Sequence, residues 1–563
     1  LYDPSGSFQN INRRYDIVYG DVMLNFNYNI RRFDIAATLG WTGRYENMNN
    51  MRVSTNGGLV TENWFDLNAS RYTASSTLQR MELLKTGYMG TLSLGWDNYL
   101  FLELTGRQER SSTLKDQSFF YPSANLSFLF SNAFRMPAWW NHGKLRLSYG
   151  VVGNAPETYA ANIIYEQGSD NGFTWNYVPS SWGNANIRPE KKYEYEIGFE
   201  SKFLNNRLGF DVSYYNNRVK DQILSTPQPS TSGVKYVLMN VGEVANEGWD
   251  ISVSATPVLT KNFRWDLTAN YGIYRNKVVK LADGVPYLEI SNIGGGGAKI
   301  QAVEGRPMGD IYVQVPQMNE NGEYLVSDKG LYMNQTELQR VGNINPDGVG
   351  GLFSSFSYKN IFLDFSIDFR IGGDVINEMY QYSTASGLTP ESLQFRDTEH
   401  GGLSYYYPGN NNASGVPVQV DPSLGAGPNG ETVYHDGVIL PGVVASTGEK
   451  NTRIIPAGYY YNQTYNWGTQ PEQLTYRHSV FDNSYVKLRE LTIGYQFPEK
   501  LISKLGMTRL SVSVFGRNLF YFYKALKNYD AESSVGTSWA SQAVVGGSTT
   551  ATRNFGVSLR ASF

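Results

Sequence analysis

Few residues of this sequence have the types and spacing that catalysis or metal binding requires. The four histidines are scattered, and no HExxH-type spacing joins any two of them: His142, His400, His435 and His478. Cysteine is absent, which removes thiolate ligands and disulfides. We interpret the histidines as ordinary polar residues of loops or turns. The sequence therefore predicts no metal site, no cofactor and no enzyme activity.

Two glycine-containing stretches have a superficial likeness to ligand-binding loops. IGGGGAK (Ile293–Lys299) lacks the Lys-Ser/Thr ending of a phosphate-binding loop and the amphipathic helix that follows it, so we expect a flexible loop. NENGEY (Asn319–Tyr324) lacks the aspartate series and the distal glutamate of a calcium loop, so we expect a tight turn.

Aromatic residues in long polar stretches are the better binding candidates. We expect substrate contact from Trp175, Tyr177, Trp182, Tyr405, Tyr406, Tyr407, Tyr460 and Trp467. Aromatic rings bury a large area at low entropy cost and keep a polar tip, which suits sugars and peptide backbones alike. Packing inside folded loops and contact with a partner protein are the two alternative roles.

The composition favours β-structure with one wet face. Aromatic residues make up 14% of the chain, yet its net charge is −3 and its mean hydropathy is −0.39. Apolar residues must therefore be interleaved with polar ones. No apolar run reaches 18 residues, but strands of a transmembrane barrel carry only about ten alternating residues each. Near-neutral charge without basic clusters gives no case for nucleic-acid binding.

A two-residue period recurs along the whole chain, and it predicts about fifteen strands. In the last one, Phe555, Val557 and Leu559 alternate with Gly556 and Ser558. The expected strands lie near 16–30, 33–45, 84–97, 99–111, 120–132, 144–155, 190–204, 207–223, 235–257, 262–280, 350–359, 361–374, 485–497, 508–518 and 553–563.

The connections between these strands alternate in length. Short turns are expected at Arg31–Arg32, Asp97–Asn98, Asn205–Asn206, Lys261–Asn262 and Lys359–Asn360. The principal long loops are expected at about 46–83, 156–189, 281–349, 375–484 and 519–552. Short turns at one end and long loops at the other are typical of outer-membrane barrels. We therefore predict an all-β fold, a transmembrane antiparallel barrel; a soluble sandwich or propeller is the alternative.

The strand count indicates part of a larger barrel. A bacterial single-chain barrel has an even number of strands with both chain ends in the periplasm, whereas fifteen is odd. The chain also opens at Leu1 without a basic and apolar leader. We expect residues 1–563 to be the C-terminal part of a larger barrel whose early strands lie outside this chain.

Six stretches resemble one family, the SusC/RagA-type TonB-dependent outer-membrane transporters, in the order that the family shows. They are NANIRPEKKYEYEIGFES (Asn184–Ser201), NVGEVANEGWDISVSATPV (Asn240–Val258), EGRPMGDIY (Glu304–Tyr312), the stretch Gly342–Gly373, SYVKLRELTIGYQFPEKL (Ser484–Leu501) and LSVSVFGRNLFYF (Leu510–Phe522). The terminal Phe563 is similar to the signal that barrel-assembly machinery reads in such proteins.

This resemblance implies a 22-stranded barrel, of which seven strands precede this chain, filled by an N-terminal plug. It also implies import of glycans or oligopeptides across the outer membrane, with energy from the TonB complex and a SusD-like lipoprotein as a lid. The long loops would be extracellular and the C-terminus periplasmic. Two alternatives are a passive pore and a barrel that binds ligand at the surface without energy-coupled transport.

Overall fold

The computed structural model describes residues 6–115, 118–170, 173–228, 231, 233–293, 297–466, 476–547 and 550–563. Fifteen strands form one sheet in the order β1-β2-β3-β4-β5-β6-β10-β11-β14-β15-β21-β22-β30-β31-β33. Their bounds are β1 Gln9–Ile30, β2 Phe33–Leu59, β3 Ser70–Trp96, β4 Leu100–Ser111, β5 Ser118–Phe128, β6 Trp140–Asn154, β10 Glu190–Phe203, β11 Leu208–Lys220, β14 Glu243–Leu259, β15 Phe263–Lys280, β21 Gly348–Tyr358, β22 Ile361–Ile371, β30 Tyr485–Gln496, β31 Arg509–Lys524 and β33 Asn554–Ser562. Each of the fifteen predicted strands is confirmed, and so is the all-β class.

Two of the expected loop boundaries are wrong. The predicted loop 46–83 is mostly strand, because β2 and β3 stay paired from Phe33↔Trp96 to Leu59↔Ser70 and leave only residues 60–69 between them. The loop expected from 519 begins at 525, after β31 ends. Strands that project beyond an apolar environment are polar on both faces, so they lose the hydrophobic period that reveals a strand.

The short turns lie where the sequence predicts them. Residues in the left-handed conformation include Arg31, Asp97, Asn205 and Lys359, each between two neighbouring strands of the large sheet. Asparagine, aspartate and glycine adopt this conformation most readily, which explains their frequency in these turns.

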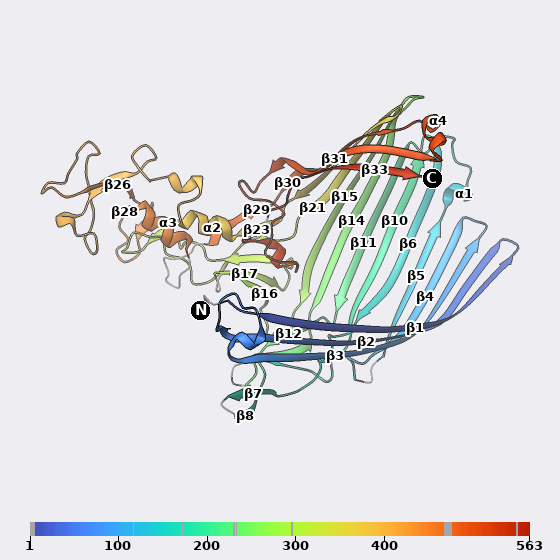
Figure 1. The fold of residues 1–563 in the computed structure, drawn as a ribbon, viewed down its shortest axis with the longest axis horizontal. Helices are drawn as coiled ribbons and strands as arrows, with labels where there is room; N and C mark the ends of the chain where they lie inside the picture. The colour runs from blue at the N-terminus through green and yellow to red at the C-terminus, as the bar shows by residue number, and fades with distance from the viewer. Residues whose placement is uncertain are drawn as a thin grey trace. The chain divides into compact units, whose positions relative to one another are not determined.

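By their internal contacts, the residues divide into two units: Leu1–Trp249 with Val279–Val285, and Asp250–Val278 with Pro286–Phe563. In the first unit β4, β5, β6, β10 and β11 lie side by side (Figure 1). Two small sheets occupy the connections of this unit: β7 (Glu166–Asp170) with β8 (Phe173–Tyr177), and β9 (Ser181–Trp182) with β13 (Tyr236–Asn240) and β12 (Ile223–Pro227).

The long connections of the second unit are folded. Those at 281–347 and 372–484, together with β32 from the connection 525–553, form the remaining sheets, in the orders β16-β17-β18-β20, β19-β27, β29-β23-β32 and β25-β24-β26-β28. The strand bounds are β16 Tyr287–Ile293, β17 Ala298–Val303, β18 Asp310–Val313, β19 Leu325–Val326, β20 Gln339–Asn343, β23 Asp374–Asn377, β24 Leu403–Tyr406, β25 Val418–Gln419, β26 Val433–Val438, β27 Val443–Val444, β28 Ile455–Pro456, β29 Val480–Asp482 and β32 Val544–Val545. The helices are α2 (Glu378–Ala385) and α3 (Ala457–Tyr465).

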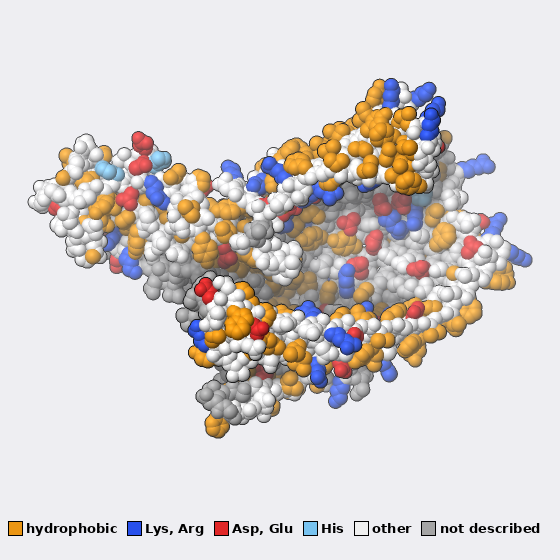
Figure 2. All heavy atoms as spheres, in the orientation of Figure 1, with side chains coloured by type: hydrophobic (Ala, Val, Ile, Leu, Met, Phe, Trp, Pro, Cys, Tyr) orange, Lys and Arg blue, Asp and Glu red, His pale blue; other side chains and the backbone are white. Residues whose placement is uncertain are grey.

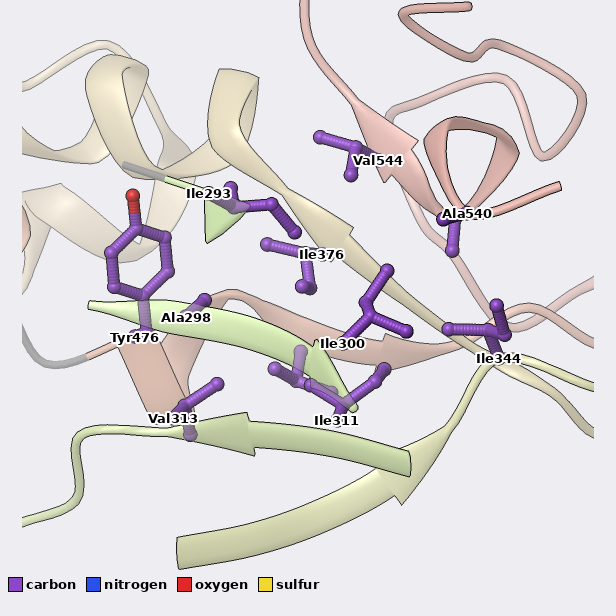
Figure 3. Packing of buried hydrophobic residues seen from close by; sticks show 12 residues of the cluster. Ile293, Ala298, Ile300, Ile311, Val313, Ile344, Ile376, Tyr476, Ala540 and Val544 are labelled. Carbon is purple, nitrogen blue, oxygen red and sulfur yellow. The ribbon is translucent and has the colours of Figure 1, made fainter. Parts of the chain in front are cut away.

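Apolar side chains from three connections form one core in this unit. Ile300 of β17 and Ile311 of β18 lie beside Ile376 of β23, and Val544 of β32 closes the cluster (Figure 3). Ile300, Ile311 and Ile376 have no exposed surface. We call this assembly, formed by the connections 281–347 and 372–484 with Ala540, Ala543 and Val544, the loop module. Its core explains why these long loops are ordered rather than structureless.

A buried carboxylate holds the loop module together. Asp310 is fully buried and accepts hydrogen bonds from Arg306 at 2.6 Å and from the amide of Asn343 at 2.9 Å. The Nε of Arg340 lies 2.8 Å from the same carboxylate. Burial acts to raise the pKa of Asp310, but the hydrogen bonds from Arg340, Asn343 and Arg306 outweigh it and hold the pKa below its ordinary value.

We predict that Asp310→Asn loosens the loop module at neutral pH, because the ion pairs with both arginines are lost. Lost hydrogen bonds to a charged group cost about 2–3 kcal/mol, which corresponds to roughly 30- to 150-fold faster limited proteolysis within 281–347. The wild-type stabilisation is present above the ordinary aspartate pKa and is lost as pH falls through the lowered pKa. Asp283→Asn, whose side chain is 94% exposed, is the control and should leave cleavage unchanged. Equal cleavage of both variants would contradict the role of Asp310.

Candidate functional site

The polar face of the sheet in the first unit carries cross-strand ion pairs. Arg146 of β6 donates to Asp211 of β11 at 2.6 Å and to Glu200 of β10 at 3.5 Å. Glu194 lies 2.6 Å from Lys192 on the same strand. Glu194, Glu200 and Asp211 are thus paired with neighbouring cations, which makes the wall polar and locally charge-balanced.

On β30 in the second unit, the regular alternation of side chains between the two faces of the sheet is interrupted. The pairing of β22 with β30 shifts between Ser366 and Ile367, which face Glu490 and Leu488, so Arg489 is an extra residue on β30. Its guanidinium donates to Asp368 of β22 at 2.6 Å and to Asn518 of β31 at 3.0 Å. A β-bulge therefore places Arg489 where it joins the two neighbouring strands.

The same guanidinium holds the connection between β31 and β33. Arg489 donates to Glu532 at 2.6 Å and 3.0 Å, and the ammonium of Lys487 is a second donor to that carboxylate. Lys487 is only 2% exposed, and its charge lies over the ring of Tyr521. Tyr521 in turn donates to Asp530 at 2.5 Å. We call residues 525–553 the strap, because Glu532 and Asp530 fasten it to the polar face.

The strap also reaches the core of the loop module. Ala540, Ala543 and Val544 belong to the buried cluster around Ile311 (Figure 3). The indole of Trp539 donates to Asn345 at 3.2 Å. The strap thus connects the wall of the sheet with the folded loops within the same unit.

A cavity of about 410 Å³ opens on the polar side of β22, β30, β31 and β33. Three of its charged groups have partners: Arg517 donates to Glu490 at 2.9 Å, and Asp364 accepts a hydrogen bond from the hydroxyl of Ser355 at 2.6 Å. Arg509 and Arg560 also line it, and neither forms an ion pair with any described residue. The cavity therefore has a surplus of positive charge that suits an anionic group.

The predicted aromatic residues of the first unit lie on small sheets. Trp175 and Tyr177 stand on β8 and are 47% and 44% exposed. Trp182 is half-buried, with its ring edge-on to Tyr165 at 5.8 Å. Trp175 and Tyr177 are thus open to contact from outside.

The predicted aromatic residues of the second unit are packed more tightly. Tyr405 is 2% exposed, donates to Asp436 at 3.1 Å and stacks on Tyr434. Tyr406 and Tyr407 are half-buried, as is Tyr460, which contacts Tyr461 at 4.9 Å; Trp467 lies outside the described residues. Burial favours the packing role for Tyr405. Substrate contact by any of the eight residues stays a prediction.

The histidines are separated in the structure as well. His142 lies 3.6 Å from Glu200, His400 lies 2.7 Å from Asp397, and the ring of His435 lies 2.8 Å from the Ser404 hydroxyl. His478 is half-buried beside Tyr465, and its partial burial, followed by the nearby Arg477, lowers its pKa. Among the described residues, no three His, Asp or Glu side chains gather as a metal site would require.

Sequence reasoning missed Arg489, Glu532 and Asp310. The one available signal was LREL within Leu488–Leu491, where two charged residues in succession interrupt the alternation. Glu532 and Asp310 lie in connections whose folding depends on distant partners, and no local pattern marks them.

In the described part of the chain, no helix combines the length and the apolar character needed to cross a membrane.

Comparison with known proteins identifies the family. The family model described as TonB dependent receptor-like, β-barrel matches residues 1–310. This chain belongs to that family. TonB-dependent receptor P3 of Formosa agariphila is 22% identical over 494 residues, which are 80% of this chain and 42% of that protein. TonB-dependent receptor SusC of Bacteroides thetaiotaomicron is 27% identical over 256 residues, 40% of this chain and 24% of that protein.

A solved structure shows the same fold. The RagAB peptide importer in its open-open state superposes with a TM-score of 0.71 at 18% identity, covering 99% of this chain and 56% of that chain. The TonB-dependent receptor chain described here thus spans about half the length of the proteins it matches. The resemblance stated from the sequence is confirmed, and the barrels of this family lie in the outer membrane.

The membrane-facing surface of this TonB-dependent barrel can be followed on β1, β2 and β3. Each row of outward side chains across these strands has one residue from β1, its partner on β2 and that residue's partner on β3. The rows are apolar or uncharged from Ile30, Phe33 and Trp96 to Val18, Tyr45 and Leu84. The next row is Asp16, Asn47 and Glu82. Twelve residues of strand span about 40 Å, which at a tilt of about 45° is roughly 28 Å of height. Apolar bands of such barrels are about 25 Å tall. The Asp16 row therefore marks the edge of the band.

The same division of faces holds at the other end of the chain. Phe555, Val557 and Leu559 are 74%, 71% and 68% exposed, whereas Ser558 and Arg560 of the same strand line the polar cavity. Hydrophobic side chains gather over β31 and β33 (Figure 2). Phe563 is 82% exposed at the end of this strand, and its role as an assembly signal stays a prediction.

We predict that Glu532→Gln releases the strap. The ion pairs to Arg489 and Lys487 are lost, and because Glu532 is partly exposed the expected cost is about 1–2 kcal/mol, or roughly 5- to 30-fold faster proteolysis within 525–553. Burial acts to raise the pKa of Glu532, but the bonds from Arg489 and Lys487 lower it overall, so the strap should also loosen as pH falls through that lowered pKa. The exposed Glu449→Gln is the control. Unchanged cleavage of the E532Q strap would refute this anchoring.

We also predict that a new charge destabilises the protein strongly on the outward face of β1 but little on its polar face. Leu24, 59% exposed in the middle of the apolar band, should lose about 2–4 kcal/mol of unfolding free energy as Leu24→Arg, because a guanidinium enters the bilayer midplane. Asn25→Arg on the polar face should cost less than about 1 kcal/mol. Urea unfolding in lipid vesicles measures both. Equal losses would show that the faces are assigned wrongly.

Proposed function

We propose that this chain is the C-terminal part of a TonB-dependent importer that moves large nutrients across the outer membrane. The observation that carries the proposal is the family match over residues 1–310 together with a fold that follows a solved importer along 99% of the chain. The cargo class that we expect is glycans or oligopeptides. We place the long loops outside the cell and the C-terminus in the periplasm.

We infer that about seven further strands complete a 22-stranded barrel. β1 and β33 are the two ends of the fifteen-stranded order, so each has an edge free of a partner within this sheet. A free edge of 22 residues on β1 is an unusual length to leave unpaired, because open edges promote aggregation. A plug within the complete barrel is the segment through which TonB would supply energy.

The charges of the polar face support a plugged interior. Arg509 and Arg560 are the unpaired cations of the cavity described above, and a carboxylate of the plug is the partner that we assign to them. A SusD-like lipoprotein is the partner that we assign to the long loops, since SusC and RagAB are the proteins this chain resembles. We propose no catalytic step.

Uptake by cells tests this function. With the full-length protein as the only importer of its kind, labelled oligosaccharides and oligopeptides should enter only while the proton-motive force and TonB are intact. Uptake that persists without TonB would indicate a passive pore instead. Surface binding without any uptake would indicate an adhesion or binding barrel.

The exposed aromatic pair on β8 provides the residue-level prediction. Trp175→Ala and Tyr177→Ala should each raise the half-saturating cargo concentration about threefold to tenfold, because a stacked ring contributes about 0.5–1.5 kcal/mol. Trp64→Ala is the matched control, since Trp64 is 56% exposed in the separate connection 60–69. If all three variants take up cargo equally, β8 does not bind it.

A further inference from the structure

The connection between β5 and β6 differs from the other short turns of the first unit. Residues 129–139 include the short helix α1 (Phe130–Ala133), whereas β1 and β2 are joined by two residues. Its sequence, LFSNAFRMPAW, contains three aromatic residues, and Arg135 is its one charged residue. Arg135 is exposed and forms no ion pair with any described residue. A loop that faced only water would not need this composition.

The connection folds back onto the apolar face rather than the polar one. The ring of Phe130 stacks on Phe199 at 6.1 Å, and the ring of Trp139 stacks on Phe203 at 5.9 Å. Phe199 and Phe203 share their face of β10 with Ile197, which is 47% exposed. The intervening Glu200 points to the opposite face, where it meets Arg146. The connection therefore extends the membrane-facing surface at its turn end.

Two large side chains of this connection are more than half exposed. Phe134 is 62% exposed and Trp139 is 53% exposed. The residues beside them are held in place. The indole of Trp140, next to Trp139, donates to Ser201 at 2.5 Å, and the ring centroid of Phe134 lies 6.0 Å from that of Phe128. Exposing two such groups to water is costly, whereas aromatic rings beside a cation are stabilised at the interface between acyl chains and headgroups.

We propose that residues 129–139 are an interfacial anchor that binds the phospholipid leaflet at the turn end of the barrel. Phe134 and Trp139 insert among the headgroups, and Arg135 binds a headgroup phosphate. The occupant is lipid because the connection continues the apolar band without a break and its single charge is complementary to phosphate.

The second unit repeats this arrangement independently. Its connection between β30 and β31 contains the short helix α4 (Glu499–Ile502) followed by one 3₁₀ turn, Ser503–Leu505. Leu501 and Leu505 are 63% and 64% exposed, one helical turn apart, while Ile502 packs inward. Lys500 and Lys504 flank them with the same spacing. A second connection thus presents apolar side chains next to cations.

Site-directed labelling tests the anchor. This chain contains no cysteine, so Phe134→Cys in the full-length protein, with any cysteine outside this chain replaced, can carry a single nitroxide. Asp283→Cys, at a 94% exposed side chain, is the water-facing control. In phospholipid vesicles, the ratio of collisions with oxygen to collisions with a water-soluble nickel chelate should be at least roughly tenfold higher at position 134.

Two results would overturn the proposal. Nickel access at position 134 equal to that at position 283 would place the connection in water. Exclusion of both relaxing agents would show that protein, not lipid, covers it. Leu501→Cys provides a second reading at a site whose substitution leaves the α1 cluster intact, and it should give the lipid signature as well.

Discussion

Each strand of the large sheet has to satisfy two solvents at once, and this constraint organises the rest of the structure. On β1 the side chains of Leu24 and Phe26 meet acyl chains, while Asn25 between them faces the polar side. Because the backbone hydrogen bonds are satisfied between strands, the barrel needs no apolar run of the kind that a transmembrane helix needs. The chain can therefore be hydrophilic on average and still lie in a membrane. The same constraint sets where the band ends, since the Asp16 row is the first outward row with charge.

The alternation is interrupted where the wall has to hold something. The β-bulge at Arg489, where β30 has one residue more than β22, turns two successive charged side chains to one side of β30, which a regular strand cannot do. One guanidinium then connects Asp368, Asn518 and Glu532, and through Glu532 it fixes the strap. The strap contributes Val544 to the core of the loop module. A single β-bulge in the sheet thus links the sheet, through the strap, to the folded loops of the same unit.

Strand positions could be predicted because alternation is a local property of the sequence. The ends of β2 and β3 could not, since Asn49 and Ser75 lie where both faces are polar and the period vanishes. The loop module escaped prediction for a different reason: Ile300, Ile311 and Val544 come from connections far apart in the chain, and each stretch alone reads as an irregular loop. Aromatic residues of the long connections could be recognised from the sequence, but their type alone could not separate exposed rings such as Trp175 from buried rings such as Tyr405.

The loop module has to be stabilised by its own core, because it lies outside the membrane. Strands in the bilayer are stabilised by lipid on one face, but loops beyond it need buried apolar area and satisfied buried charges of their own. The buried charge of Asp310 is satisfied, because Arg306 and Arg340 compensate a carboxylate that has no access to water. EGRPMGDIY therefore reads as a structural signature of the folded loops, with Gly309 in the left-handed conformation directly before Asp310. An ordered platform of this kind can present the same surface to a partner or cargo each time, which loops without a core could not do.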